Sequence, residues 1–369
     1  MRLIQVSPPA ATLVAAGAFD PSDVVRSFVF ASNLAAQEAT GDPAASVAPE
    51  RVLNRLKGST ESTTLLFAAV EGPAVGEVGE LGLPTTPAAV EPGADSPLFD
   101  YRGFILLTLP LLEEKGHADI ELVLDVDLLP LPGEPLDPEG EEVACWLAAQ
   151  SLTLMEKLGR DVAQVGLTVE PEDPFLPAFR ELGFECKHRE EQIVCPVPEN
   201  SAVPLLPHGL TVRVWEDYDI PDAELPDVLD LLTVADADTC NGALTVEPVV
   251  WTAERLRDAA ARLSDRKAHT LLMGLEIEGR VVVLSELAHQ EHGDPEVAEW
   301  TLTVTARDRR GEGLARLAQL VALREVRRVW PEVTRAYGSF APADAPSAQL
   351  AQSLGAQRIS AAEAWELKL

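Results

Sequence analysis

The expected order of strands and helices along this chain starts again after residue 209. Residues 196–209 hold four prolines together with Asn200 and Ser201, a composition typical of a linker. At 369 residues the chain is long enough for two domains of common size. We therefore expect two copies of one α/β domain, at residues 1–198 and 210–369, joined by a linker at residues 199–209.

Two local comparisons support this duplication. The apolar segment 119–127 (DIELVLDVD) can be aligned with segment 297–305 (VAEWTLTVT). The alternative explanation for this match is chance similarity between short apolar strands. The second comparison matches two sets of residues with the same internal spacing: Pro174, Leu182 and Gly183 with Pro346, Leu354 and Gly355.

Hydrophobic periodicity and turn residues predict the elements of each copy. For the first copy we expect helices over 20–38, 49–57, 141–158 and 175–182, a hairpin over 63–70 and 75–83, an insertion over 84–118, strands over 119–127 and 162–169, and a last hairpin over 183–195. For the second copy we expect a strand over 210–215, helices over 225–235, 253–263, 314–329 and 347–354, a hairpin over 271–277 and 281–288, strands over 297–305 and 334–340, and a strand ending at 369.

The charge balance excludes some partners. Acidic residues outnumber basic ones by 60 to 29, which gives a net charge of −31. Nucleic acids and anionic membranes bind clusters of Lys and Arg, so we expect neither as a partner. The acidity would help a cationic substrate to approach, although it is equally explained as a means of keeping the protein soluble.

Cysteine usage and the N-terminus bear on the compartment. The four cysteines have no zinc-finger spacing, and we expect reduced thiols and a cytoplasmic protein. The apolar residues among the first eighteen could imitate a signal peptide, but Ser7-Pro8-Pro9 interrupts them, and a first strand explains them equally well. The sequence contains no run of 18 apolar residues without a charge, so we expect no membrane span.

One motif predicts a binding site for an anion. The strand ending at Thr305 is followed by a basic, glycine-containing turn, Arg309-Arg310-Gly311-Glu312-Gly313, and then by an amphipathic helix. Glycines before a helix leave backbone N–H groups free at the positive end of the helix dipole, which forms an anion site suited to a pyrophosphate. Arg309 and Arg310 would add positive charge. The turn is not a P-loop, because no Gly-Lys-Ser/Thr ends it.

Here the sequence resembles a known family. The pattern Arg310-x-x-Gly313-x-Ala315 resembles the acetyl-CoA pyrophosphate loop, Arg/Gln-x-x-Gly-x-Gly/Ala, of the GNAT acyltransferase superfamily. Asp344 and Ser347 stand where many members carry Asn and Met. The whole chain looks like a tandem GNAT protein, similar in layout to mycothiol synthase and related two-domain bacterial acetyltransferases. The resemblance implies two α/β (α+β) domains, each a mixed, mostly antiparallel sheet flanked by helices.

The resemblance also implies a site. Acetyl-CoA would lie in a V-shaped gap between the strands at 297–305 and 334–340, with pantetheine paired to backbone near Val304 and Thr305. The remaining residues expected to bind the cofactor are Arg310, Gly311, Glu312, Gly313, Leu314, Ala315, Asp344 and Ser347. The acetyl group would pass directly to an amine, whose proton a carboxylate accepts.

Two carboxylates are candidates for this base. Glu299 matches a strand position that some members use, and Glu286 is the second candidate; a surface acid on an alternating strand is the other interpretation of Glu299. The tyrosine that members place before the Leu-Gly corner is replaced by Ala351. The group that protonates the thiolate is therefore open between Ser353, Tyr337 and water.

The first copy departs further from the family. At the position of its phosphate loop stands PGEPLDPEG, residues 132–140. Prolines remove backbone donors, and acids repel a pyrophosphate. We expect the first domain not to bind acetyl-CoA in the usual way and either to complete the acceptor cleft or to stabilise the second domain.

We predict no metal site. His289-x-x-His292 lies in a loop without a third ligand, and the calcium-like spacing from Asp236 to Glu247 is irregular. The predicted function is an acetyl-CoA-dependent N-acetyltransferase for a small, cationic amine, present as a monomer or homodimer. The alternative is a non-catalytic acyl-CoA sensor or scaffold, and a protein acetyltransferase is a third option.

Overall fold

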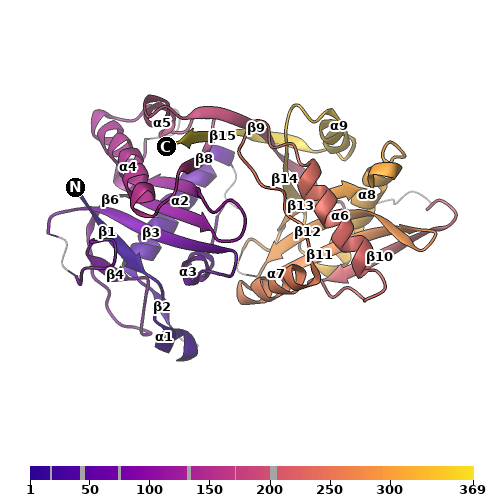
Figure 1. Cartoon of the computed structure of the whole chain (residues 1–369), viewed down its shortest axis with the longest axis horizontal. Helices are drawn as coiled ribbons and strands as arrows, with labels where there is room; N and C mark the ends of the chain where they lie inside the picture. The colour runs from indigo at the N-terminus through magenta and orange to yellow at the C-terminus, as the bar shows by residue number, and fades with distance from the viewer. Residues whose placement is uncertain are drawn as a thin grey trace. The chain divides into compact units, whose positions relative to one another are not determined.

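The computed structural model describes residues 1–16, 19–41, 46–73, 76–130, 134–170, 172–199, 206–291 and 293–369. The chain forms two compact units (Figure 1). Unit 1 consists of Met1–Arg189, Gly242–Thr245 and Ser360–Leu369, and unit 2 of Glu190–Asn241 and Val246–Ile359. None of the described helices is long and apolar enough to cross a lipid bilayer.

Unit 1 is a mixed, mostly antiparallel sheet with helices on both faces. Its strands follow the order β15-β8-β7-β6-β3-β1-β4, in which the pairs β7·β8 and β1·β4 are parallel. Its elements are β1 (Arg2–Ser7), α1 (Ala11–Ala16), β2 (Asp20–Pro21), α2 (Asp23–Thr40), α3 (Pro49–Lys57), β3 (Ser62–Glu71), β4 (Thr85–Pro87), β5 (Ala89–Val90), β6 (Asp100–Pro110), β7 (His117–Leu124), the 3₁₀ turn η1 (Val126–Leu128), α4 (Pro138–Lys157), β8 (Val162–Thr168) and α5 (Leu176–Glu181).

Unit 2 repeats this design. Its strands follow the order β10-β11-β12-β13-β14-β9, and the pair β13·β14 is parallel. Its elements are β10 (Leu210–Glu216), α6 (Leu225–Asp238), α7 (Ala253–Asp265), β11 (Ala268–Ile277), β12 (Arg280–Gln290), β13 (Val297–Thr305), the 3₁₀ turn η2 (Arg307–Arg309), α8 (Leu314–Val329), β14 (Arg335–Phe340) and α9 (Ala345–Ser353). Two strands, β9 (Glu185–Pro196) and β15 (Gln357–Lys368), have residues in both units.

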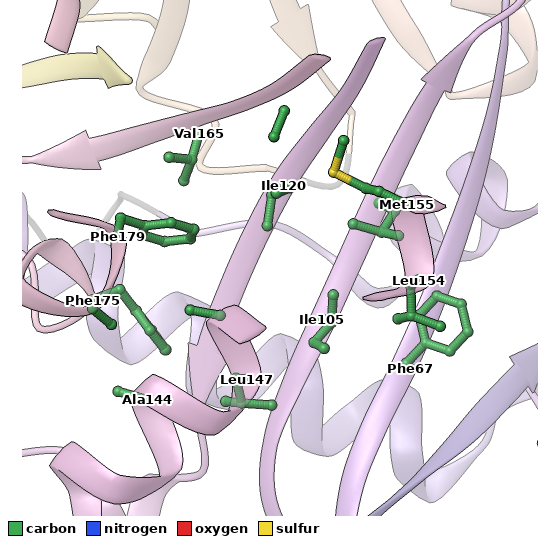
Figure 2. Packing of buried hydrophobic residues seen from close by; sticks show 14 of the residues in the cluster. Phe67, Ile105, Ile120, Ala144, Leu147, Leu154, Met155, Val165, Phe175 and Phe179 are labelled. Carbon is green, nitrogen blue, oxygen red and sulfur yellow. The ribbon is translucent and has the colours of Figure 1, made fainter. Parts of the chain in front are cut away.

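Alternation along the strands builds the core of unit 1. Phe67 and Ile105 point to the face covered by α4, where Figure 2 shows Leu147 and Met155 packed against the sheet. The neighbouring strand residues, such as Leu106, point to the other face, which α2 and α3 cover. Successive side chains of a strand project to opposite faces, so apolar strands such as β6 can supply two cores at once.

The two units exchange their last strands. Residues Ala362–Lys368 of β15 pair with β8 in unit 1, and Glu191–Pro196 of β9 pair with β14 in unit 2. Figure 1 shows the end of the chain, β15, beside β8. The division of the structure therefore differs from the expected boundaries at 198 and 210, and residues 200–205 of the expected linker lie outside the described residues. Local periodicity identifies a strand but not the sheet that it joins.

Two expectations for the first copy were wrong. The hairpin over 63–70 and 75–83 does not form among the described residues, because β3 pairs with β1 and β6 instead. Segment 76–83 holds three glycines and forms only the single bridge Val78↔Pro84. The hairpin over 183–195 is one long strand, β9. No Gly, Pro or Asn follows residue 183 before Pro196, so nothing there favours a turn.

The internal repeat has a slightly different register from the expected one. His117↔Val162 opens the parallel pair of unit 1 and Val297↔Arg335 that of unit 2. Position 117 therefore matches 297, two residues from the expected match of 119 with 297. Helices α5 and α9 are both followed by a Leu-Gly pair whose glycine has a positive φ, 89° and 76°, as the second sequence comparison predicted.

Candidate active site

Strands β13 and β14 of unit 2 separate after three residue pairs. Their parallel register ends at Glu299↔Tyr337. Strand β13 continues for six residues to Thr305, whereas β14 continues to Phe340 while pairing with β9 on its other edge. The backbone of β13 beyond Glu299 therefore turns away from its parallel partner, at the place where the V-shaped gap was expected.

A β-bulge lies at the same point. Glu286 pairs with Leu302, but the next residue, Leu287, pairs with Trp300, which leaves Thr301 as an extra residue on β13. Bulges re-aim backbone and side-chain groups and are frequent next to active sites. Glu299 is opposite Ala288, two positions from Glu286, so both candidate bases project from the same face of the sheet.

Glu286 is the more unusual of the two carboxylates. It is 6% exposed, and the Thr301 hydroxyl donates a 2.6 Å hydrogen bond to its Oε1. Its other oxygen, Oε2, is buried with no partner within hydrogen-bond distance among the described residues. Burial raises the pKa of Glu286, and the hydroxyls of Thr301 and Tyr218 counteract part of that rise. A buried carboxylate with one unsatisfied oxygen is suited to bind a proton or an ammonium group.

The sequence reasoning missed Tyr218. Burial, and next the charge of Glu286, raise the pKa of Tyr218 far above its usual value, so its hydroxyl stays protonated. Tyr218 and Asp217 have left-handed φ angles of 62° and 49°, which is costly for residues other than glycine. The Asp217 carboxylate stabilises this turn by accepting from the Thr270 backbone N–H at 2.8 Å and by contacting His269 Nδ1 at 3.0 Å. No local sequence signal marks such a turn.

Glu299 lies at the fork itself. It is the last β13 residue paired with β14, opposite Tyr337, and is half-buried. Its position at the fork and its shared face with Glu286 keep it as a second candidate base.

The glycine-containing turn follows β13, which ends with Val304 and Thr305. Gly311 and Gly313 have φ angles of 81° and 76°, which any residue with a Cβ adopts at a cost. Gly313 is the N-cap of α8, with no side-chain hydrogen bond at the cap and no acid in the first turn. No described heavy atom lies within 4 Å of where a Cβ would stand on either glycine. The backbone N–H groups from Gly311 to Ala315 thus have space for a phosphate, and this turn fits the expected group.

The arginines in and before the turn, of which Arg309 and Arg310 were expected to add positive charge, are paired with carboxylates. Asp238, the last residue of α6, accepts from Arg307 at 2.6 and 2.9 Å and from Arg310 at 2.5 Å. Arg310 also donates to the Thr305 carbonyl at 3.2 Å. Hydrogen bonds from Arg307 and Arg310 hold the pKa of Asp238 far below its usual value. Arg309 faces Glu312 at 3.6 Å.

One cation of this region pairs with no described carboxylate. Arg316, in the first turn of α8, is exposed and donates from Nε to the Ser353 hydroxyl of α9 at 3.1 Å. This contact links the two helices that follow the separated strands. Arg316 is a second functional candidate that the sequence reasoning missed, although its place directly after Ala315 could have marked it.

Asp344 and Ser347 contact each other at the start of α9. Asp344 is the N-cap, and its carboxylate accepts from the Ser347 backbone N–H at 3.3 Å and from the Ser347 hydroxyl at 2.5 Å. Both side chains therefore close a helix cap. A contact of either with a cofactor stays a prediction.

Unit 1 has different chemistry at the corresponding place. Residues 131–133 of its loop lie outside the described part. Asp137 caps α4 by accepting from the Gly140 N–H at 2.7 Å, and Glu139 and Glu141 occupy the first turn. The register of β6 with β7 is regular from Gly103↔Leu124 to Thr108↔Asp119.

The histidine pair considered for a metal falls partly outside the described residues, since His292 is not among them. His289 Nδ1 lies 2.8 Å from the Val297 carbonyl. No group of three or more His, Cys, Asp or Glu residues in the described ranges is arranged to hold a metal ion.

Solved structures identify the architecture. No family model and no curated protein matches the sequence. A tandem GNAT protein from the clavulanic acid biosynthesis pathway is 14% identical, with a TM-score of 0.66 over 99% of this chain and 98% of its own. The fold is the tandem GNAT fold.

Two further solved structures are similar over nearly the whole of this chain. A GCN5-related N-acetyltransferase from Sphaerobacter thermophilus is 12% identical, with a TM-score of 0.61 over 100% of this chain and 96% of its own. A glucosamine N-acetyltransferase region of a fungal multi-domain β-N-acetylglucosaminidase is 10% identical, with a TM-score of 0.58 over 95% of this chain and 38% of that one. The similarity in layout to mycothiol synthase stays a prediction.

Proposed function

We propose that the protein is an acetyl-CoA-dependent N-acetyltransferase whose catalytic domain is unit 2. The observation that carries this proposal is the combination at one end of β13: an open helix N-terminus after Gly313, and a buried carboxylate, Glu286, beside the bulge where the strands separate. The tandem GNAT fold supports the same conclusion.

The residues around α8 would bind the cofactor. Acetyl-CoA supplies an acetyl group activated as a thioester. The N–H groups of Gly311–Ala315 would donate to its pyrophosphate, and Arg316 adds a positive charge in the same helical turn. The backbone of β13 between Trp300 and Thr305, which β14 does not pair, would bind the pantetheine amides. Asp344 and Ser347 would shape the opposite side through the cap of α9.

Glu286 would accept the proton of the amine. An amine attacks only after losing a proton, and a carboxylate whose pKa lies closer to neutrality shares that proton more evenly with the substrate. Burial raises the pKa of Glu286 in this direction. Thr301 orients one oxygen through its 2.6 Å hydrogen bond and leaves Oε2 for the substrate. Glu299, on the same face, would serve as a second acidic contact or as the base itself.

The acceptor would be a small cationic amine. Two carboxylates on one face of the sheet and a net charge of −31 favour a positively charged substrate over an anionic one. A non-catalytic acyl-CoA sensor is the second candidate, favoured by Ala351 at the place where GNAT members carry a tyrosine. In the enzyme, the CoA thiolate would take its proton from Tyr337, Ser353 or water.

Calorimetric titration of acetyl-CoA tests the cofactor site. We expect micromolar binding to the wild type and no binding to Gly313→Glu, which places a charge against the phosphate. Gly159→Glu is the matched control, because Gly159 also has a positive φ with open space around it but lies in unit 1. Binding that survives in Gly313→Glu would contradict the site.

A thiol-release assay then separates the two candidate functions. Acetyl-CoA is mixed with polyamines, aminoglycosides, amino sugars and a lysine-containing peptide. Release of CoA with a small cationic amine supports the proposed acceptor class, and release with the peptide alone contradicts it. Binding of acetyl-CoA without turnover of any of these amines favours the sensor.

A further inference from the structure

The connection between α6 and α7 belongs to both units. The chain leaves unit 2 after Asn241, contributes Gly242–Thr245 to unit 1, and returns to unit 2 at Val246. Neither the fold nor the proposed cofactor site explains why these four residues, which lie between two segments of unit 2, belong to unit 1.

Within unit 1 these four residues are firmly held. The Ala243 N–H donates to the Lys187 carbonyl at 2.8 Å. Gly242 has a φ of 59°, and a Cβ there would stand 2.3 Å from the same carbonyl, so only glycine fits this approach. Thr245 donates twice to Glu366 of β15, from its N–H at 2.8 Å and from its hydroxyl at 2.7 Å.

Glu366 is the centre of this attachment. Its side chain is 2% exposed. Gln164 of β8 donates from Nε2 to Glu366 Oε2 at 3.0 Å and to the Thr245 carbonyl at 3.1 Å. Burial opposes ionisation, but the hydrogen bonds from Thr245 and Gln164 lower the pKa of Glu366 overall. A buried carboxylate held by several donors has few alternative positions, because moving away leaves it unpaired.

The other end of the connection holds the glycine-containing turn. Asp238 binds both Arg307 and Arg310. Three residues separate it from Gly242, so their Cα atoms can be at most about 15 Å apart. The two anchored ends of the connection are therefore close along the chain.

We propose that Glu366 is a positioning residue for the cofactor turn of unit 2, acting through Thr245, the α6–α7 connection and Asp238. The effect on CoA rests on the proposed function, whereas the mechanical coupling does not. Unit 1, whose own helix α4 is capped by Asp137, then contributes to the reaction by fixing the end of α6. This gives unit 1 a role in the activity of its neighbour.

Acetyl-CoA titration and amide hydrogen exchange test the coupling in the full chain. Glu366→Gln is expected to weaken acetyl-CoA binding about three- to tenfold and to speed exchange in residues 307–313. The matched control is Glu363→Gln, on the same strand and bound to Arg189 and Trp365, which should change neither. Thr245→Val removes one hydroxyl and keeps the Glu366 charge, so it covers the case in which Glu366→Gln fails to fold.

A double-mutant cycle distinguishes positioning from general destabilisation. If Glu366 acts through Asp238, then Glu366→Gln adds little to the effect of Asp238→Asn, whereas independent damage would add fully. Unchanged exchange in residues 307–313, or full additivity, overturns the proposal. If the wild type binds no acetyl-CoA, the proposed function fails, and the exchange rates alone still decide whether the coupling exists.

Discussion

The N-termini of α4 and α8 occupy equivalent places in the two units and differ in every property that matters for an anion. Helix α4 begins at Pro138, is capped by the Asp137 carboxylate and carries two acids in its first turn. Helix α8 begins after Gly313, with no side-chain hydrogen bond at its cap and no acid in that turn. The positive end of α4 is already neutralised from within the chain, whereas that of α8 is free for a ligand. The same fold can therefore keep or lose a phosphate site through a few residues.

The strands before these helices differ in the same way. The last antiparallel pairs before the two turns are Gly103↔Leu124 and Val283↔Thr305. Three residues further along the inner strand stand Leu106 in unit 1, buried at 1% exposure, and Glu286 in unit 2. Unit 1 has a regular register and a leucine where unit 2 has a bulge and a buried carboxylate. The described part of unit 1 thus lacks counterparts of the open helix N-terminus and of Glu286, whereas Asp119 occupies the position of Glu299 in the parallel pair.

The largest effect is expected when Glu286 is replaced by a neutral residue, as unit 1 has the neutral Leu106 at this position. Glu286→Gln should lower kcat about 10²- to 10⁴-fold, because the amide cannot take the amine proton, while acetyl-CoA binding stays unchanged. In the wild type, activity should fall as the pH drops through the raised pKa of Glu286, since only the carboxylate accepts a proton. Steady-state rates from pH 5 to 9 measure both effects, and a variant with wild-type kcat would show that Glu286 is not the base.

The second prediction converts the start of α8 into that of α4. Gly313→Asp places a carboxylate at the cap, as Asp137 does in α4. We expect acetyl-CoA affinity to fall about tenfold or more, which corresponds to about 1.4 kcal/mol, because the carboxylate repels the phosphates. Gly313→Ser, which adds a Cβ and no charge, separates strain from electrostatics. Equal losses in the two variants would show that charge is not the cause.

The reverse change in unit 1 should affect stability alone. Asp137→Ala removes the cap of α4 and is expected to cost about 1 kcal/mol of unfolding free energy. Denaturant unfolding measures this loss, with Glu134→Ala, just upstream of the helix, as the control. Acetyl-CoA affinity should not rise, because Pro138 still removes one backbone donor. A gain of a second acetyl-CoA site would contradict our account of unit 1.

The smallest effect concerns the turn that supports Tyr218. Hydrogen bonds to the carboxylates of Asp217 and then Glu291 raise the pKa of His269. The stabilisation is complete below the unfolded-state pKa of about 6.5 and is lost as the pH rises through the higher folded-state value. The difference in melting temperature between wild type and His269→Gln should therefore shrink from pH 6 to pH 9. A difference that is constant over this range would show that the ion pair has no role.

The sequence predicts unit 2 better than unit 1. Strand β13 and helix α8 have the expected bounds, because alternation, glycines and a helical period agree there. The pairing of Arg307 and Arg310 with Asp238 was not predictable, since 69 and 72 residues separate the partners. Tyr218 was missed for the same reason: its left-handed turn is stabilised by Thr270 and His269 on another strand. Patterns of local spacing carry no information about such contacts.

The exchange of last strands has a consequence for synthesis on the ribosome. Strand β8 ends at Thr168, and its partner in unit 1 begins only at Ser360. At about 5–20 residues per second, roughly 10–40 s separate the two during translation. For that time the β8 edge of the nascent chain is exposed, and such an edge can pair with another chain. Unit 1 is therefore translated early, but its sheet is completed only when the last strand has been synthesised. The folding yield of unit 1 depends on what protects the β8 edge during that interval.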